Sequence, residues 1–395
     1  MNRELKMDDR RIQINKLLNF CRFLLPFAVC YTSLAIHVCV AQELTIPKFR
    51  QQRVIVSATD GEVRKYLAFP ALVDLESEVL VSFKRGRSHA NDTGAGLDIV
   101  RLREGSGEPS DLQCIARLED GIMQMGEWIK FPNGDFASFI DAQKEPRATR
   151  IGLRSVRFRK GGKAFEKVQR LGLVNGVEYG YAFDSLVKNG ETLVLAMRFA
   201  NLAGGKSLVP ARPHAGSVDV LRSKDNGESW EFLKDLSHEF GDIPINESAF
   251  VEHSLGFLVT TRGYDSHQRL HLVDADFNVL KRADLTDESP FVEREIGRPR
   301  LISRDGNYYL LGRNWTNRAH PMQLCWLRID PESLRIVSAV VLDNASGDNV
   351  TDGYYADVYF RERKGRTFAH VITYKGLNHA PPEIIELTFD WSELR

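Results

Sequence analysis

The chain has 395 residues, 43% of them hydrophobic, and its 53 Lys and Arg residues balance its 53 Asp and Glu residues. That hydrophobic content is enough for a sizeable core. Because no long basic or acidic run lies in the body of the chain, the composition argues against a nucleic-acid partner and against electrostatic binding to a membrane surface. The chain has five cysteines but no Cys-x-x-Cys or histidine-rich spacing, so we expect neither a disulfide framework, nor a metal site, nor a cofactor.

The first 41 residues differ from the rest. Basic residues lead into an apolar run at 23–41, which ends in the small residues Cys39 and Ala41. This order is typical of a secretory signal peptide cleaved before Gln42, and it predicts a secreted or periplasmic protein of residues 42–395. The same run is also long enough for an uncleaved signal anchor, which would keep the protein on a membrane.

From residue 44 onward, short β-branched and aromatic stretches alternate with Gly, Asn and Asp. Six strand–turn–strand segments recur at intervals of 57, 55, 65, 51 and 57 residues, and each is followed by a second strand pair; they begin at Phe69, Gly126, Tyr181, Asn246, Gly297 and Tyr354. Repetition of about four strands per unit predicts an all-β fold, a six-bladed β-propeller of four-stranded antiparallel blades. A strand near residues 44–58 would complete the last blade and close the ring. The alternative is a two-sheet sandwich with coincidental spacing.

One of the second strand pairs contains the octapeptide SKDNGESW, Ser223–Trp230. Its Asn226-Gly227 dipeptide favours a hairpin turn in which both central residues have positive φ. The side chains of Ser223 and Asp225 can bond the turn amides, and Trp230 can cover the turn. Because the flanking VLRSKDNGESWEF aligns with SVRFRKGGKAFEKV earlier in the chain, we expect a structural turn on the outer part of a blade.

Polar residues occur at corresponding ends of the six hairpins, where a propeller would gather them at one mouth of its central channel. They include Lys84, Arg85, Arg87, His89, Asp92, Asp141, Asp184, Arg198, Glu247, Arg262, Arg298, Arg300, Arg313, Asp352, Tyr354, Tyr355, Asp357 and Tyr374. A buried cluster of unpaired arginines would be costly, so their recurrence predicts a charged ligand or partner.

Several of these segments resemble the sialidase (neuraminidase) superfamily. SKDNGESW is similar to its Asp-box (BNR repeat), and NESAFVEHSLGFLVTTR resembles its segment in which a glutamate opens an inner strand and an arginine closes the hairpin. Resemblance extends to GRPRLISRDGNYYLLGR, to DGYYADVYF and to LAFPALVDLESEVLVSFKRGRSHANDTGAG, so that it covers roughly residues 60–376. It implies a propeller that acts on acidic glycans or glycoconjugates.

The resemblance also implies a mechanism in which tyrosine is the nucleophile. By position, that residue would be Tyr355, with Tyr354 as the second choice. A neighbouring carboxylate, Glu247, would take the phenol proton, because phenol is a poor nucleophile at its ordinary pKa of about 10.

Arginines hold the carboxylate of the sugar in this family, as bidentate geometry favours. By position, two of them would be Arg262 and Arg298, and Arg85 would border the site. The acid/base carboxylate would be Asp92, with Asp98 as an alternative in the same loop. His89, nearby, is a candidate substrate contact or else a solvated loop residue.

One departure from the family concerns its first arginine, whose place before the proline of LAFPAL is held by Ala68. The function we predict is removal of a terminal acidic sugar by an exo-acting, sialidase-like glycoside hydrolase. The missing arginine keeps open a non-catalytic propeller that binds glycan or protein. A third alternative is a neutral-sugar glycosidase that uses two carboxylates such as Glu247 and Asp141.

Overall fold

A computed structural model describes residues 44–59, 61–90, 92–103, 108–145, 149–199, 216–315 and 322–395. The predicted signal segment, residues 1–41, lies outside these ranges. No helix within them has the length and apolar character needed to cross a bilayer. Cys114 and Cys325 are both free thiols.

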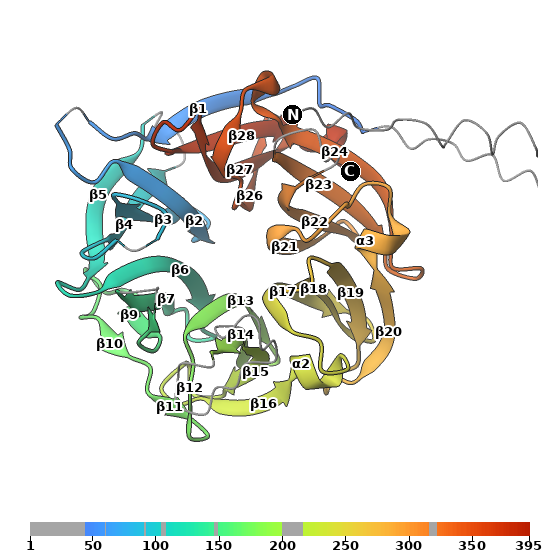
Figure 1. Ribbon diagram of the computed structural model, residues 1–395, viewed down its shortest axis with the longest axis horizontal. Coiled ribbons are helices and arrows are strands. Elements are labelled where there is room, and N and C mark those ends of the chain that lie inside the picture. The colour runs from blue at the N-terminus through green and yellow to red at the C-terminus, as the bar shows by residue number, and fades with distance from the viewer. Residues whose placement is uncertain are drawn as a thin grey trace, which may run out of the picture. The chain divides into compact units, whose positions relative to one another are not determined.

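The described chain forms six antiparallel blades arranged in a ring, as the repeat predicted (Figure 1). Blade 1 consists of β2 (Tyr66–Asp74), β3 (Glu78–Gly86), β4 (Gly96–Arg103) and β5 (Ser110–Arg117). Blade 2 consists of β6 (Ile122–Lys130), β7 (Phe136–Lys144), β9 (Arg154–Phe158) and β10 (Gln169–Arg170), with the short β8 (Thr149–Arg150) beside β7. A small hairpin, β11 (Leu173–Val174) and β12 (Val177–Glu178), leads to blade 3, which consists of β13 (Tyr181–Lys188), β14 (Glu191–Arg198), β15 (Ser217–Ser223) and β16 (Glu231–Asp235).

The second half of the ring repeats this plan. Blade 4 consists of β17 (Ile245–His253), β18 (Gly256–Gly263), β19 (Gln268–Val273) and β20 (Val279–Asp284), and blade 5 of β21 (Gly297–Arg304), β22 (Asn307–Asn314), β23 (Gln323–Asp330) and β24 (Arg335–Asp343). Blade 6 consists of β26 (Asp357–Arg363), β27 (Arg366–Leu377), β28 (Glu383–Asp390) and β1 (Gln51–Val56), with β25 (Val350–Gly353) beside β27. Single helical turns, all capped by an Asp or Asn side chain, follow the last strand that the chain contributes to blades 3 to 6: α2 (Leu236–Glu239), α3 (Leu285–Glu288), η1 (Ala345–Gly347) and η2 (Trp391–Glu393).

The ring is closed by pairing of the first strand with the last. β1 lies antiparallel to β28, with Gln51 opposite Thr388 and Val54 opposite Ile385. This confirms the predicted closure by a strand within residues 44–58. Because β1 covers the outer edge of β28, blade 6 gains a fourth strand from the opposite end of the chain.

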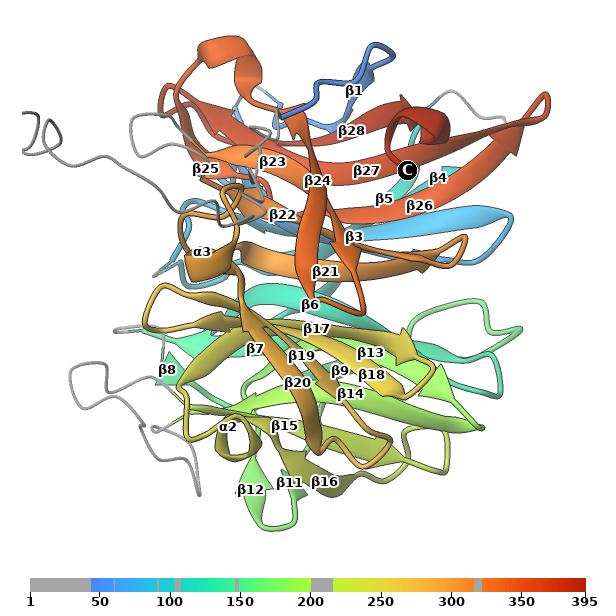
Figure 2. The same cartoon turned by 90° about the vertical axis from the view of Figure 1, so that its right-hand side faces the viewer.

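Apolar side chains between neighbouring blades form the core. Figure 2 shows the sheet of β21–β24 between the sheets of β17–β20 and β26–β28. One buried cluster joins blades 4 and 5 through residues such as Leu258 and Leu310, and another joins blades 5 and 6 through Trp326 and Phe389. Because each blade packs mainly on its two neighbours, apolar burial holds the inner strands around a common axis.

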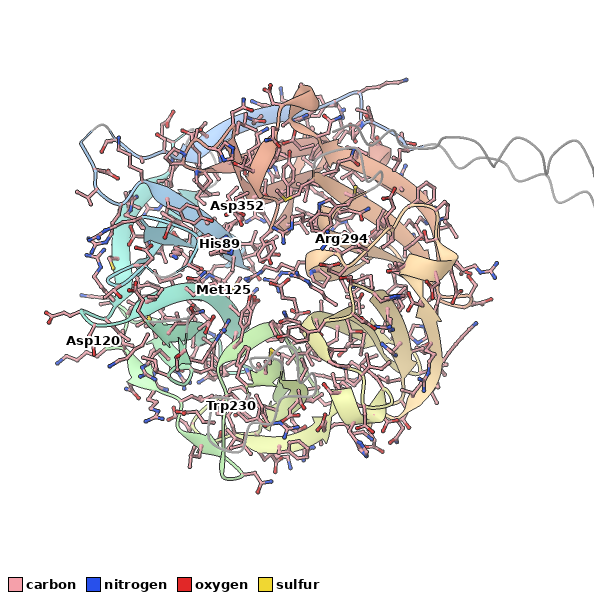
Figure 3. All side chains as sticks on the ribbon, in the orientation of Figure 1. His89, Asp120, Met125, Trp230, Arg294 and Asp352 are labelled. Carbon is pink, nitrogen blue, oxygen red and sulfur yellow. The ribbon has the colours of Figure 1, made fainter. Side chains whose placement is uncertain are left out.

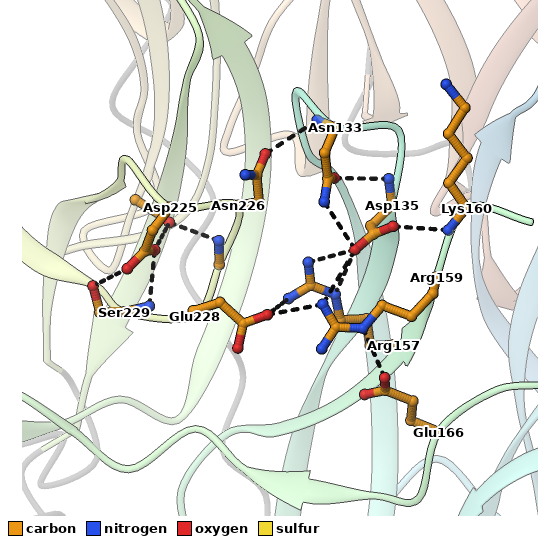
Figure 4. A network of polar contacts seen from close by, with 12 residues as sticks. Asn133, Asp135, Arg157, Arg159, Lys160, Glu166, Asp225, Asn226, Glu228 and Ser229 are labelled. Carbon is orange, nitrogen blue, oxygen red and sulfur yellow. Dashed lines mark hydrogen bonds and ion pairs between the residues drawn. The ribbon is translucent and has the colours of Figure 1, made fainter. Parts of the chain in front are cut away.

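The octapeptide turn has the predicted conformation, and it docks on the preceding blade. Asn226 and Gly227 have φ values of 59° and 83°. The Ser229 amide donates to Asp225 (2.9 Å) and the Gly227 amide to Ser223 Oγ (2.7 Å). Glu228 accepts hydrogen bonds from two arginines of blade 2, as Figure 4 shows. The turn therefore joins two blades. It follows Ser223 at the end of β15, whereas Ser217, paired with Arg198 of β14, lies at the opposite end of that strand.

Register shifts occur near the start of the inner strand in blades 1 to 5, between Ala68 and Ala71 in the first and Gly297 and Arg300 in the fifth. A bulge re-aims the side chains beside it. Phe69 and Arg298 lie within two of these irregular starts and have φ values of 56° and 41°, and Tyr354, just before the inner strand of blade 6, has a φ of 67°. Such left-handed conformations are uncommon for bulky residues and cluster at functional sites.

Candidate functional site

The candidate site lies where inner strands begin and the strands next to them end. Pairing places the start of β17 at the end of β18 and the start of β21 at the end of β22, so Glu247, Arg262 and Arg313 share one end of the ring. Figure 3 shows His89, Met125, Arg294 and Asp352 around the middle of the ring, with Trp230 toward the rim.

Two adjacent tyrosines open blade 6 and point to different places. The positive φ of Tyr354 turns its side chain into the space between blades, where its hydroxyl donates to Asp343 Oδ2 (2.9 Å). Tyr355 points into the channel, and its carbonyl oxygen accepts from Thr373 (3.0 Å). The geometry therefore presents Tyr355, the first choice from the sequence, and withdraws Tyr354.

Glu247 lies beside the Tyr355 hydroxyl. Its Oε2 accepts from Arg262 Nη1 (2.5 Å) and from the backbone amide of Arg298 (2.8 Å). Burial disfavours the carboxylate, but Arg262, the Arg298 amide and a hydrogen bond from Tyr355 together outweigh it and lower the pKa of Glu247 below its ordinary value. Glu247 is therefore an ionised acceptor next to a phenol.

Two guanidinium groups flank the same phenol. Arg262 Nη1 lies 3.3 Å and Arg313 Nη2 lies 3.4 Å from the Tyr355 hydroxyl oxygen. Arg313 also lies over the Tyr355 ring, 4.7 Å from its centroid. Arg262 is paired with Glu247, whereas Arg313 makes no ion pair with a carboxylate of the described residues, and its Nε is buried without a partner. The two guanidinium groups therefore have N–H donors left over to bind an anion.

The protonation of Tyr355 follows from the same contacts. Burial, followed by the negative charge of Glu247, raises the pKa of Tyr355 above its ordinary value, although Arg313 and Arg262 act in the opposite direction. The phenol is consequently neutral at neutral pH, with an ionised carboxylate ready to receive its proton.

Arg298 turns away from this phenol. Its guanidinium is buried and donates to Glu127 Oε2 (2.7 Å), an oxygen that Arg300 also contacts (2.6 Å). Burial raises the pKa of Glu127, against the attraction of these two arginines. Arg298 therefore reaches the Tyr355 cluster through its backbone amide rather than as a carboxylate-binding side chain.

The blade 1 candidates divide into structural and exposed groups. Arg85 donates to Asp98 (2.6 Å) and Glu62 (2.8 Å), so its charge and that of Asp98 are neutralised within the blade. Asp92 has a fully buried carboxylate that accepts from the Arg87 amide (2.7 Å) and lies 3.5 Å from Lys84 Nζ. With these contacts, Asp92 stabilises the loop that follows β3. The acid/base role predicted for Asp92 stays a prediction.

His89, in contrast, is exposed at the mouth. Its side chain is 56% exposed, and its Nδ1 lies 2.8 Å from Asp352 Oδ2. Tyr374 donates to the other Asp352 oxygen (2.9 Å), and Tyr66 donates to the same carboxylate. Burial raises the pKa of Asp352, but the hydrogen bonds from His89 and the two tyrosines lower it by more. The pKa of Asp352 is therefore below its ordinary value.

Ala68 is fully buried, and the next residue, Phe69, packs its ring against the tyrosines of the channel. The ring centroid of Phe69 lies 5.7 Å from that of Tyr355 and 5.5 Å from that of Tyr374. The place that the resemblance assigns to a first arginine is therefore apolar.

Other carboxylates are less available. Asp141 is buried, accepts from Gln143 (2.6 Å) and lies 3.5 Å from Arg150; burial raises its pKa. Among the described residues, His267, Asp284 and Asp287 have atoms close enough to share a metal ion, but Arg269 already lies 3.1 Å from Asp284. They lie on the outer part of blade 4 and not beside Tyr355.

Sequence reasoning named Arg313 and Asp352 among the polar residues of the mouth but did not select them for the site. Arg313 is the second-last residue of β22, just as Arg262 is the second-last residue of β18. That shared register was the available signal for Arg313. No local signal pairs Asp352 with His89, because they are separated by 263 positions.

No protein-family model matches the chain, and no curated protein matches it in sequence. Solved structures do match. A protein of unknown function from Dyadobacter fermentans is similar with a TM-score of 0.64 and 16% identity, over 86% of this chain and 98% of that chain.

Sialidases are also among the similar structures. The K499G mutant of NanB sialidase from Streptococcus pneumoniae matches with a TM-score of 0.60 and 11% identity, over 87% of this chain and 71% of its own. Trypanosoma rangeli sialidase, as a covalent intermediate with 2,3-difluorosialic acid, matches with a TM-score of 0.55 and 8% identity, over 87% of this chain and 59% of its own. At these identities the likeness concerns the fold, and the chain therefore shares a six-bladed propeller with sialidases.

Proposed function

We propose that the protein is an exo-acting glycoside hydrolase that removes a terminal acidic sugar from a glycan or glycoconjugate. The observation that carries this proposal is one phenol, Tyr355, surrounded by the ionised Glu247 and by two guanidinium groups, Arg262 and Arg313, at the open end of the channel. The sialidase-like fold supports the reaction class.

In this reaction the Tyr355 oxygen attacks the anomeric carbon, and Glu247 receives the phenol proton as the bond forms. Removing that proton to an adjacent base overcomes the weak nucleophilicity of a phenol. Phenol attack also suits an acidic sugar, since a neutral nucleophile avoids the repulsion that a carboxylate nucleophile would meet at an anionic substrate.

The sugar carboxylate would bind to Arg262 and Arg313. Arg313 is the stronger candidate for a direct contact, because no carboxylate of the described residues pairs with it. Charge-assisted hydrogen bonds from guanidinium to carboxylate are roughly twice as strong as neutral ones. Arg262 would keep Glu247 oriented and share the ligand through its remaining N–H groups.

A non-catalytic glycan-binding propeller is the second candidate. It is favoured by Phe69 and Ala68, which leave the place of the family's first arginine apolar. Such a protein would bind acidic glycans on an array and release no sugar.

The deciding experiment is covalent trapping. We expect that 2,3-difluorosialic acid adds one glycosyl group to the intact protein and that peptide mapping places it on Tyr355. Tyr355→Phe should take up no label and should lose turnover of a fluorogenic sialoside. Tyr308→Phe, beside the turn of the β21–β22 hairpin and at the opposite end of that hairpin from Arg313, is the matched control and should behave as the wild type. Binding of sialosides with neither label nor turnover would favour the non-catalytic alternative.

Export is part of the proposal. Cleavage before Gln42 would release residues 42–395 outside the cytoplasm, and N-terminal sequencing of the protein recovered from culture medium or periplasm tests it. An intact N-terminus in a membrane fraction would indicate the signal anchor instead.

A further inference from the structure

The loop that follows β3 holds His89 rigidly at the mouth of the channel. Lys84 Nζ donates to the carbonyl oxygens of Ser88 (2.9 Å) and His89 (3.1 Å), and Gln124 donates to the same His89 oxygen (2.6 Å). From inside the loop, Asp92 accepts from the Arg87 amide. These buried polar contacts fix the backbone beneath an exposed imidazole, which is the arrangement expected for a preorganised group.

The imidazole is also oriented through its ring. Nδ1 contacts Asp352 (2.8 Å) and lies 3.1 Å from the Tyr66 hydroxyl, while Tyr374 holds the second Asp352 oxygen (2.9 Å). With Nδ1 bonded to a carboxylate, Nε2 is the nitrogen left to meet a ligand. A histidine whose second nitrogen is fixed by a carboxylate is a common proton-transfer arrangement.

His89 and Tyr355 are linked by two shared neighbours, Phe69 and Arg313. The Phe69 ring contacts both side chains, with its centroid 5.0 Å from that of the imidazole and 5.7 Å from that of the phenol. A cleft of about 710 Å³ is lined by His89, Asp352, Tyr66 and Arg313, and Arg313 also contacts the Tyr355 hydroxyl. A sugar held by Arg313 over Tyr355 would therefore direct its leaving group into the cleft beside His89.

We propose that His89, oriented by Asp352, is the general acid and base of the glycosidase, in place of the aspartate that the family resemblance implies. This inference rests on the proposed function. The imidazolium Nε2 donates its proton to the glycosidic oxygen while the bond from that oxygen to the anomeric carbon breaks. At the same time the Tyr355 oxygen bonds to that carbon, and Glu247 takes the phenol proton.

The second half of the reaction restores every group. The neutral imidazole takes a proton from a water molecule, whose oxygen bonds to the anomeric carbon as the bond to Tyr355 breaks. Glu247 returns its proton to the phenol oxygen. The products are the free sugar and the alcohol, and His89 is again an imidazolium.

The contacts of Asp92 favour this assignment. The carboxylate that the sequence aligns with an acid/base role is fully buried, and one of its oxygens is occupied by the Arg87 and Ser88 amides and by Lys84. Gly86 packs against it so closely that an added Cβ would lie 1.8 Å from its Oδ2. Asp92 supports the loop, and His89 is the proton donor that this loop presents.

The test compares two leaving groups on one sugar. For the wild type and His89→Gln, kcat/KM is measured with 4-methylumbelliferyl sialoside, whose phenol leaves without protonation, and with sialyllactose, whose alcohol needs a proton. We expect His89→Gln to lose about 10²-fold or more on sialyllactose and less than about 10-fold on the umbelliferyl substrate. Azide should accelerate His89→Ala on the umbelliferyl substrate and yield a glycosyl azide, because azide attacks without a general base.

The control variants separate position from chemistry. Asp352→Asn, which acts through His89, should shift the pH profile of sialyllactose turnover. His238→Gln replaces an exposed histidine on the helical turn α2, and it should leave kcat/KM unchanged for both substrates. Equal losses on both substrates in His89→Gln, or the leaving-group pattern in Asp92→Asn, would overturn the assignment to His89 and leave Tyr355 chemistry intact. A wild type that neither turns over nor becomes labelled would overturn the proposed function and this inference together.

Discussion

The two tyrosines at 354 and 355 have the same side chain, yet one belongs to the core and the other to the site. Their neighbours along the chain do not distinguish them. A positive φ of 67° at Tyr354 decides their directions, since it sends Tyr354 to Asp343 and Tyr355 to Arg262 and Arg313. Such a conformation is disfavoured for a tyrosine and persists only where surrounding contacts impose it.

At the same scale, Glu247→Gln tests the acceptor for the phenol proton. Glutamine preserves the size of the side chain but removes its basicity, so kcat with an umbelliferyl sialoside should fall about 10²–10⁴-fold. Glu252→Gln changes an exposed residue of the same strand, β17, and should leave kcat unchanged. Equal kcat values for Glu247→Gln and the wild type would exclude Glu247 as the base.

Asp184 supports a prediction about pH. Burial, against the attraction of Arg300, raises its pKa to about 7. Between the ordinary pKa near 4 and this value, the native state binds more protons than the unfolded state, so the free energy of unfolding falls as pH rises. One such group contributes at most about 1.4 kcal/mol per pH unit.

Asp184→Asn removes this titration, and its free energy of unfolding should therefore fall less steeply between pH 4 and 7 than that of the wild type. Its absolute stability is lower, because asparagine cannot accept from both the Ser185 and Phe250 amides as the carboxylate does. Urea unfolding at several pH values gives both quantities. Parallel curves for the two proteins would contradict the elevated pKa.

At the scale of elements, the turn Ser223–Trp230 has two structural functions. Its own hydrogen bonds join β15 to β16, and Glu228 and Gly227 join it to blade 2. The first function was predictable from the residue types of the turn. The second depends on the neighbouring blade, because Gly227 lies against the Phe131 ring.

Gly227→Ala is expected to destabilise the protein more than Gly161→Ala. Both glycines occupy turns with positive φ, +83° and +75°, and alanine there costs about 1–2 kcal/mol in each. An added Cβ at Gly227 would lie 2.4 Å from Phe131, whereas at Gly161 nothing lies within 4 Å. Overpacking should make the difference about 1–3 kcal/mol in urea unfolding. Equal decreases in the free energy of unfolding for the two variants would show that Phe131 moves aside for the added methyl group without loss of stability.

At the scale of the whole molecule, ring closure decides whether the site exists. Glu247 and Arg262 belong to blade 4 and Arg313 to blade 5. Tyr355 and Asp352 belong to blade 6, with Asp352 in β25, and His89 follows the first hairpin of blade 1. The His89–Asp352 contact crosses the seam between the first and last blades. Strand β1 fastens this seam by pairing with β28.

A chain that begins at Ser57, and so lacks β1, should therefore unfold more easily than a chain that begins at Gln42. Losing the buried Ile55 and Val56 side chains alone should remove about 3–6 kcal/mol, and the uncovered edge of β28 should promote aggregation. Urea unfolding and light scattering of the two chains measure these effects. If both remain monomeric with the same midpoint, β1 does not hold the ring.

The sequence by itself determined the blades, because strands and turns depend on nearest neighbours: alternating apolar residues, and glycine or asparagine where φ must be positive. It also indicated the Glu247–Arg262 pair, since both residues lie in one hairpin. Only the tertiary structure decided that Arg298 turns to Glu127, that Asp92 is buried and that His89 meets Asp352. These outcomes depend on bulges, backbone dihedrals and contacts between distant blades, which arise when six locally specified sheets pack around one axis.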